Sequence, residues 1–584
     1  MATSRSTRLL LWIVAVGVLI SMALVVAGII YWKADSNFLA DTTPRPLYAR
    51  LGGELHDAPG SGTITLDPKD MPPLVTETAQ AIRDAAKDDA VSELWIEIRP
   101  IVGGWAEVEE LRGALWAFRQ SGKPCTVWTD TLTTKEYYLA TACDKIQLAP
   151  GGVALVNGLS VTTSYFAGTF EKLGVHADFE HVGNFKSAVE PLQRTGPSDA
   201  ASEATDALLD SLYGQLVSKV AEGRGISVDD AKALVDLSPM VPTEAVASHL
   251  VDGNDWRDVT WSDDALEDAT KMKDYLTQRR AAWRRGTGTV AVVYAEGTIV
   301  SGDGNDSLFG GSNVIADRAL VKLLEEVRED DDVKAVVLRV NSPGGSGGAS
   351  DTIWREIQKL RETKPIVASM SDYAASGGYY ISMGANEIVA QPNTLTGSIG
   401  VFGGKLNLGG LYDKIGVTNH TYERGQSADI FSSIHDFDEV DRAKFRAYLE
   451  NFYQTFVSRA TNDRPLSYPE LEAVAQGRVW TGEQALERKL VDRLGGLDVA
   501  IARAAELGNL AEGTYAIERL PERKSFFEEL LHDLEHPEGE DVSALVSGVL
   551  GPETQAAVAS LQLLERVLEG GHVAAMLPFE ITVR

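Results

Sequence analysis

Two segments between Val336 and Val401 decide the fold. They read VVLRVNSPGGSGG (336–348) and IVASMSDYAASGG (366–378), with a helical pattern between them. Each begins as an apolar strand and ends in a glycine-rich turn, and glycine permits backbone conformations that are closed to other residues. Two such turns at the ends of parallel strands can point free N–H groups into one crevice, with Ser376 beside it. A nucleophile beside an anion-binding pocket is the geometry of acyl transfer.

The composition limits the class of protein. A chain of 584 residues should hold several domains, and its formal net charge of -30 argues against nucleic acid as a partner. The two cysteines, Cys125 and Cys143, exclude a disulfide scaffold and a cysteine-rich metal site. They lie in segments that resemble a strand and a helix, so we expect buried thiols rather than a disulfide.

The N-terminus predicts a membrane anchor. Residues 9–32 form an uncharged run of 24 positions, which is longer than the roughly 20 needed to cross a bilayer. Arg5 and Arg8 precede it, which favours a cytoplasmic N-terminus (1–8). A cleaved signal peptide is the alternative, but the run is too long and no small-residue cleavage site follows it. We expect an uncleaved anchor, a linker over 33–45, and a body outside the cytoplasm.

The body is an internal duplication. Val91, Gly174 and the pair Tyr137–Tyr138 each meet the same residues 242 positions later. The offset drifts by only two along the chain, so we predict two related halves over 46–285 and 286–512, followed by a helical tail over 513–584. Short apolar strands alternate with helical patterns in each half, which predicts an α/β fold with parallel sheets.

Comparing the halves suggests a divided site. At the offset of 242, Ser376 faces Thr134, and Lys186 faces Ala428. The second half therefore keeps a serine turn that the first has lost, while the first keeps a lysine. A lysine can act as a base only when neutral, so its pKa would have to fall by roughly 3 units from about 10.4. Burial of Lys186 beside Phe185 could lower it by that amount.

Three other residues remain as alternatives or supporting groups. Ser346 lies in Gly-Gly-Ser-Gly-Gly, which matches the G-x-S-x-G nucleophile elbow of α/β-hydrolases, although we interpret that segment as an oxyanion loop. His181 could serve a Ser-His-Asp triad. Ser398, in a glycine turn, could hold the lysine by a hydrogen bond. The sequence contains no HExxH, Walker or dinucleotide motif, so we expect neither a metal nor a cofactor.

Four segments resemble the signal peptide peptidase A family in its long, duplicated form (protease IV). They are LRVNSPGG (338–345), AASGGYY (374–380), LTGSIGVFG (395–403) and FKSAVEP (185–191). The resemblance implies a tandem Clp/crotonase-like fold of repeated ββα units and a tetramer. It also implies a dyad of Ser376 and Lys186 supported by Ser398. The oxyanion hole would come from Gly377 and the Gly344–Gly345 turn.

These observations together predict a membrane-anchored serine endopeptidase. It would cleave signal peptides and other short apolar peptides on the outer face of the cytoplasmic membrane, without nucleic acid as a partner. Two alternatives stay open: a catalytically inactive crotonase-like scaffold or binding protein at the membrane, and a Ser-His hydrolase that uses Ser346.

Overall fold

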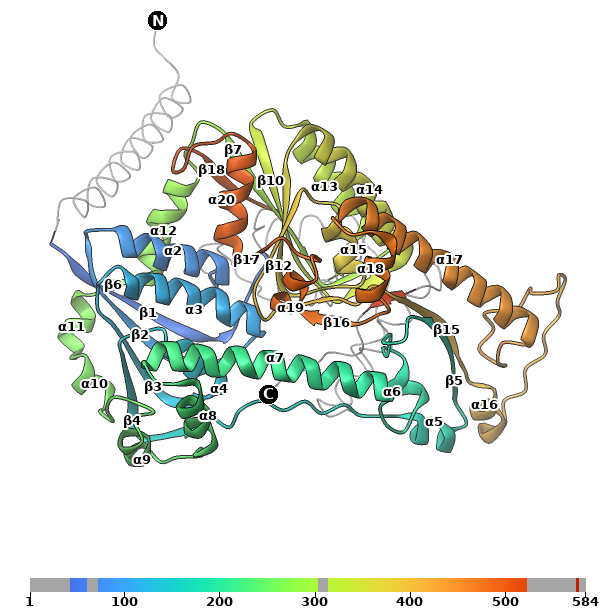
Figure 1. Ribbon diagram of the computed structural model, residues 1–584, viewed down its shortest axis with the longest axis horizontal. Helices are drawn as coiled ribbons and strands as arrows, with labels where there is room; N and C mark the ends of the chain where they lie inside the picture. The colour runs from blue at the N-terminus through green and yellow to red at the C-terminus, as the bar shows by residue number, and fades with distance from the viewer. Residues whose placement is uncertain (1–42, 60–71, 303–313, 522–573, 577–584) are drawn as a thin grey trace, which may run out of the picture.

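The computed structural model describes residues 43–59, 72–302, 314–521 and 574–576 (Figure 1). The predicted anchor at 9–32 and nearly all of the linker lie outside these ranges. Among the residues described, no helix is both long enough and apolar enough to cross a bilayer.

The first half is built on a five-stranded sheet in the order β4–β3–β2–β1–β6, with parallel pairing throughout. Its strands are β1 (Arg45–Glu54), β2 (Val91–Val102), β3 (Cys125–Thr133), β4 (Lys145–Leu155) and β6 (Thr270–Lys271). The crossovers between strands are α2 (Val75–Lys87), α3 (Trp105–Gln120) and α4 (Thr134–Ala140). The helices after β4 are α5 (Ala167–Leu173), α6 (Glu190–Gln193), α7 (Asp199–Arg224), α8 (Val228–Asp236), α9 (Pro242–Ala247), α10 (Arg257–Thr260), α11 (Asp263–Asp268) and α12 (Met272–Trp283).

The second half repeats this order around a larger sheet. Its path is β16–β14–β12–β10–β7–β18, with β13 joining β12 to β17. The strands are β7 (Thr289–Glu296), β10 (Val333–Ser342), β12 (Ile366–Ala375), β13 (Glu387–Ala390), β14 (Leu395–Gly397), β16 (Val479–Thr481), β17 (Arg493–Leu494) and β18 (Ala516–Leu520). The helices are α13 (Asp317–Glu329), α14 (Gly347–Thr363), α15 (Gly377–Met383), α16 (Gly409–Ile415), α17 (Glu439–Asp463), α18 (Tyr468–Val474), α19 (Gly482–Glu487) and α20 (Leu497–Leu507).

The element order reproduces the duplication found in the sequence. The long helices α7 and α17 begin 240 positions apart, and the short helices α5 and α16 begin 242 apart. Each half also buries its own extended apolar core between its sheet and its helices. Helices cover both faces of a parallel sheet, which explains why its strands are continuous apolar runs in the sequence.

A third sheet joins the two halves. It runs β5–β15–β19–β11–β8–β9, and β5 (His176–Val182) is its only strand from the first half among the residues described. The others are β8 (Thr298–Val300), β9 (Val314–Ala316), β11 (Gly344–Ser346), β15 (Val401–Asn407) and β19 (Ala574–Met576). Seven residues of β5 pair antiparallel with β15, so the first half reaches across and completes a sheet of the second.

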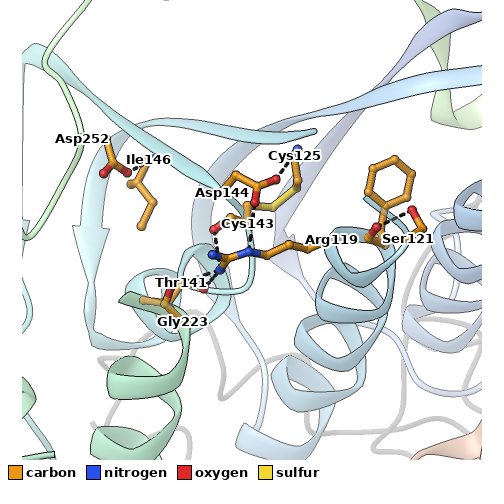
Figure 2. Close-up of a disulfide and its surroundings, with 10 residues drawn as sticks. Arg119, Ser121, Cys125, Thr141, Cys143, Asp144, Ile146, Gly223 and Asp252 are labelled. Carbon is orange, nitrogen blue, oxygen red and sulfur yellow. Dashed lines mark hydrogen bonds and ion pairs between the residues drawn. A yellow bond between two sulfur atoms is a disulfide. The ribbon is translucent and has the colours of Figure 1, made fainter. Parts of the chain in front are cut away.

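The expectation of free thiols is wrong, because Cys125 and Cys143 form a disulfide (Figure 2). Cys125 begins β3, and Cys143 lies just before β4 rather than within a helix. Since β3 and β4 are parallel neighbours, both begin at the same edge of the sheet, and Asp144 N donates to Cys125 O at 3.0 Å. A crossover that returns to the start of the next strand therefore brings the two sulfurs together.

The prediction of a helical tail is also wrong for its described beginning. β18 (Ala516–Leu520) is a strand that pairs in parallel with β7 and extends the sheet of the second half. The pairing partner of this strand is more than 200 positions away in the sequence, and local patterning carries no information about it. Residues 522–573 lie outside the described ranges.

Candidate active site

The sheet that joins the halves delivers Lys186 to the second half. β5 ends at Val182, and Gly183 turns the chain with a φ of 113°. Phe185 N then donates to Gln476 O at 2.8 Å, which fixes the backbone just before the lysine. A Cβ atom on Gly477 would lie 2.6 Å from Lys186 Cβ, so only glycine lets the loop of the second half approach the lysine this closely.

Ser376 lies on a strained turn between β12 and α15. Its φ of 56° and ψ of -111° belong to a region that costs a non-glycine residue about 1–3 kcal/mol. Ser376 N donates to Gly397 O at 2.8 Å, and Tyr380 N donates to Ser376 O at 2.8 Å, so the surrounding backbone holds this conformation. The turn leaves the hydroxyl facing Lys186.

The structure brings Lys186, Ser376 and Ser398 together. Lys186 Nζ lies 2.8 Å from Ser376 Oγ, 2.9 Å from Ser398 Oγ and 3.2 Å from Ser398 O. Ser398 also has a positive φ, 51°, which turns both of its oxygens toward the amine. Lys186 lies in the loop after β5, Ser376 in the turn between β12 and α15, and Ser398 directly after β14. Lys186 is thus about 200 positions away from the two serines in the sequence.

Lys186 is 1% exposed, and burial lowers the pKa of its amine well below the usual value. No neighbouring carboxylate counters this effect among the residues described. A buried amine without a counter-ion releases its proton because an uncompensated charge is costly in a low-dielectric interior. The amine is therefore suited to act as a base.

The two glycine turns meet beside the serine, as the sequence analysis predicted. A Cβ on Gly378 would lie 2.5 Å from Ser342 O, so the turn after β10 packs directly on the turn after β12. Gly377 N is the first N–H of α15, and the first N–H groups of a helix have no partner within that helix. Gly344 N donates to Ser342 Oγ at 3.2 Å, and Gly345 pairs with Ile299 in β8.

The alternative residues take other roles. Ser346 is the N-cap of α14, where its Oγ accepts from Ala349 N at 3.4 Å, and its other close polar neighbour is Ser301 Oγ at 3.3 Å. His181 Nδ1 lies 3.2 Å from Gly183 O on an exposed side chain. The structure brings neither residue into contact with the other, so it gives no geometric support to a Ser-His pair.

Sequence reasoning missed the residues that hold the lysine loop. Gln476 and Gly477 pack against the loop that carries Lys186. A further contact is that of Ser376 Oγ, which lies 3.4 Å from Gly400 O. The only signal for Gly477 in the sequence is an isolated glycine between two apolar segments. Its importance comes from the loop of the first half, which packs on it and lies almost 300 positions earlier in the sequence.

Comparison with known proteins gives the family. The model of peptidase family S49 matches residues 117–274 and 358–511, one match in each half. The serine protease SPPA of Arabidopsis thaliana is 35% identical over 73% of this chain and 64% of its own, slightly under two thirds of its length. Protease 4 of Salmonella typhi is 33% identical over 75% of this chain and 72% of its own.

Solved structures are more distant. ClpP1 of Listeria monocytogenes is 15% identical and matches 39% of this chain and 99% of its own, with a TM-score of 0.24. A likeness at that score carries no argument, so the Clp/crotonase-like part of the predicted fold stays a prediction. The predicted relationship to protease IV and signal peptide peptidase A is confirmed by the sequence matches. The chain belongs to peptidase family S49, as a mixed α/β serine peptidase with two such domains in tandem.

Proposed function

We propose that this protein is a membrane-anchored serine endopeptidase that hydrolyses signal peptides and other short apolar peptides with Ser376 as nucleophile and Lys186 as general base. The single observation that carries the proposal is the 2.8 Å contact between Lys186 Nζ and Ser376 Oγ, formed across the two halves. A buried amine and a strained serine in direct contact have no evident structural purpose.

The three contacts of Lys186 fit a neutral amine. Such an amine has two N–H groups and one lone pair, and Ser398 O and Ser398 Oγ can accept the two N–H groups. The lone pair is then left for the hydroxyl proton of Ser376. Ser398 thus orients the base, which is the supporting role that the resemblance implies.

The reaction follows from this arrangement. Ser376 Oγ attacks the scissile carbonyl carbon while its proton moves to Lys186 Nζ. The tetrahedral intermediate collapses, the C–N bond breaks, and Lys186 returns the proton to the leaving amine. A water molecule then attacks the acyl-enzyme ester with Lys186 again taking a proton, which releases the new carboxyl end and regenerates Ser376.

The oxyanion that forms during attack needs N–H donors. Gly377 N, next to the nucleophile at the start of α15, is the donor that the geometry supports best. The turn of Gly344 and Gly345 is the second candidate, and Gly344 would have to exchange its bond to Ser342 Oγ for one to the oxyanion.

The substrate would bind as a β-strand. β19 lies between β11 and β15 and pairs antiparallel with both, with Gly344–Ser346 opposite Met576–Ala574. A peptide in that position would run past the oxyanion turn with its backbone paired on both sides, a common mode of peptide recognition. β19 must leave before a substrate strand can pair with β11.

Two observations support a location outside the cytoplasm. The uncharged run at 9–32 has the length of a bilayer span, and the disulfide of Cys125 and Cys143 is of the kind that persists in oxidising compartments. A relative from Enterococcus faecium is named a putative signal peptide peptidase, which supports the substrate class. We propose the cytoplasmic membrane as the site of action and a homotetramer as the assembly.

The proposal is tested by covalent labelling. A peptidyl phosphonate that reacts with activated serines should modify the full-length protein once, at Ser376, as mapped by mass spectrometry. The Ser376→Ala variant should not be labelled, and Lys186→Ala should be labelled at least about 100-fold more slowly than the wild type. Neither variant should cleave an apolar peptide, and circular dichroism should show that each is folded. Labelling at Ser346 instead, or cleavage that persists in Ser376→Ala, would show that another serine carries the activity.

A further inference from the structure

We propose that Arg339 is a positioning residue for the reaction: with Asp57 and Asp372 it fixes a bulge in β12 that aims Ser376 at the half carrying Lys186. The proposal rests on the function proposed above. It concerns residues outside the dyad, the oxyanion turns and Ser398.

The bulge is visible in the pairing of β10 with β12. The two strands stay in register from Val336 opposite Ile366 to Val340 opposite Met370, and the next pair is Ser342 opposite Ala374. One residue of β10 therefore faces three residues of β12, at positions 371–373. Bulges of this kind redirect the strand that carries them, and this one ends three residues before Ser376.

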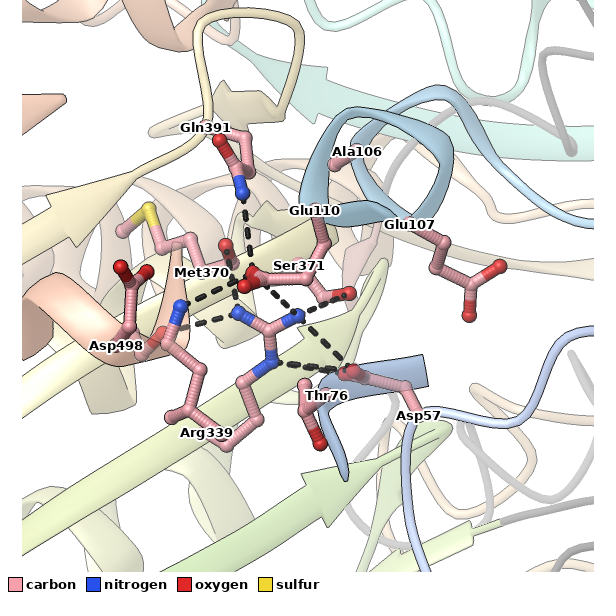
Figure 3. A network of polar contacts seen from close by, with 12 residues as sticks. Asp57, Thr76, Ala106, Glu107, Glu110, Arg339, Met370, Ser371, Gln391 and Asp498 are labelled. Atoms are coloured by element: carbon pink, nitrogen blue, oxygen red, sulfur yellow. Dashed lines mark hydrogen bonds and ion pairs between the residues drawn. The ribbon is translucent and has the colours of Figure 1, made fainter. Parts of the chain in front are cut away.

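Arg339 anchors the first residue of the bulge (Figure 3). Its side chain is 0% exposed, and Nη2 donates to Ser371 Oγ at 3.1 Å, while Nη1 donates to Ser369 Oγ at 2.9 Å and to Met370 O at 3.4 Å. Nε and Nη2 also donate to the two carboxylate oxygens of Asp57, each at 2.9 Å. One guanidinium thus joins β10, the bulge of β12 and a residue of the first half.

Asp372, the second residue of the bulge, is held by the first half directly. Its Oδ1 accepts from Ala106 N at 2.7 Å and from Glu107 N at 3.2 Å, both in the first turn of α3. A Cβ on Gly104, the N-cap of α3, would lie about 2 Å from this carboxyl group, so the glycine leaves room for it. Tyr373 N, the third residue, donates to Asn341 Oδ1 at 3.2 Å.

Further charged groups surround the guanidinium of Arg339. Glu110 Oε2 lies 4.0 Å from Nη2 and also accepts from Gln391 Nε2 and Leu497 N, each at 3.0 Å. Arg83 contacts the other oxygen of Glu110 at 3.2 Å. Glu110 would keep Arg83 if the guanidinium were removed, but the buried carboxylate of Asp57 would lose the cation that it pairs with, and breaking a buried pair in this way is costly.

The junction matters for catalysis because nucleophile and base come from different halves. A displacement of about 1 Å at a reacting group can lower the rate by about 100-fold. Loosening the junction would also admit water to Lys186, and the pKa of an amine that is lowered by burial rises when water returns. Positioning therefore predicts two linked effects, a lower kcat and an acid limb displaced to higher pH.

The test compares two buried arginines in the full-length protein. Arg339→Lys keeps the charge but loses the planar fork that reaches Asp57 and the bulge together. Arg464→Lys is the matched control: Arg464 is 5% exposed and forms a bidentate pair with Asp492, at 2.7 and 2.9 Å, and its hydrogen bonds to described residues go to Asp492 and Lys489, not to the bulge. We expect both variants to melt at lower temperature.

Only Arg339→Lys should lose activity. We expect its kcat to fall by about 10- to 100-fold, with KM within about threefold of the wild type and the acid limb moved to higher pH. Arg464→Lys should keep both kcat and the limb. If the two variants lose kcat equally, or if Arg339→Lys keeps the wild-type kcat and limb, Arg339 is only a structural residue.

If Arg339→Lys does not fold, a second pair of variants, at Asp372, tests whether the bulge positions Ser376. Burial raises the pKa of Asp372, so a neutral amide is a close substitute. Asp372→Asn should keep nearly all of kcat, whereas Asp372→Ala should lose about 10- to 100-fold; equal kcat in the two would contradict the proposal. An active Ser376→Ala variant would instead overturn the proposed function, whatever Arg339 does.

Discussion

The two halves have the same order of elements but differ at the turn that follows the corresponding strands β3 and β12. In the second half, the turn presents Ser376 and the N–H of Gly377. In the first half, Lys135 stands in place of Gly377, and its amine donates to Gly103 O. Glu136 accepts from Ile101 N at 2.7 Å, so side chains satisfy the backbone there.

This difference fits the proposal that the two halves share one active site. The first half has closed its own turn with Lys135 and Glu136 and contributes Lys186 from the loop after β5. The second half keeps the open turn and has Ala428 where the first has Lys186. In the proposed mechanism, each half alone therefore lacks one of the two groups that proton transfer needs.

The largest effect on activity should come from replacing Ser376, and replacing its counterpart Thr134 in the first half is the matched control. Ser376→Ala should abolish peptide cleavage, a loss of several orders of magnitude, because Ser376 Oγ is the nucleophile of the proposed reaction and Ser398 serves only to orient Lys186. Thr134→Ala should be almost silent, since Thr134 Oγ1 only donates to Gly158 O. Initial rates on an apolar peptide measure both, and equal losses would mean that the turn of the first half also takes part.

Combining the dyad variants sharpens the same comparison. Because nucleophile and base act as a unit, Lys186→Ala with Ser376→Ala should be little slower than either single variant. The residual rates of the three proteins, measured at high enzyme concentration, give the interaction directly. Multiplicative losses would indicate that Lys186 acts apart from Ser376.

A smaller loss should follow from Gly477→Ala, which tests the contact between the halves. The new Cβ would lie 2.6 Å from Lys186 Cβ, so we expect kcat to fall by about 100-fold as the lysine moves. Gly225→Ala is the control, because Gly225 also has a positive φ, 66° against 76°, but faces open space. Gly225→Ala should lower the free energy of unfolding without changing kcat. A similar drop in kcat in Gly225→Ala would contradict the idea that the loss in Gly477→Ala comes from its contact with Lys186.

The disulfide should matter least for activity. Its cysteines align with Ile366 and Ala385 of the second half, both buried, so the second half fills the same place with apolar side chains. The variant Cys125→Ile/Cys143→Ala should keep kcat and lose about 3 kcal/mol of unfolding free energy, as is typical for a loop of this length. Urea unfolding measures the loss, and a changed kcat would link this edge of the sheet to the site.

The contact between Lys186 and Ser376 could be predicted from the sequence, because the comparison of the halves placed Ser376 opposite Thr134 and Lys186 opposite Ala428. The parallel sheets followed from the alternation of apolar strands with helices. The disulfide, the strands β18 and β19 and the bulge of β12 depend on partners far along the chain. Arg339 lies within the LRVNSPGG segment (338–345), but nothing in the local sequence marks it as the residue that Asp57 binds.

The central claim is that Lys186 of the first half is the neutral base for Ser376 of the second. It is tested most directly by the rate at which a phosphonate modifies Ser376 as a function of pH, in the wild type and in Lys186→Ala. The neutral amine is the active form, so the wild-type rate should rise with pH through a pKa well below 10.5, the usual value for lysine. Lys186→Ala, folded by circular dichroism, should lose this limb and react at least about 100-fold more slowly. An unchanged rate and an unchanged limb in Lys186→Ala would contradict the account.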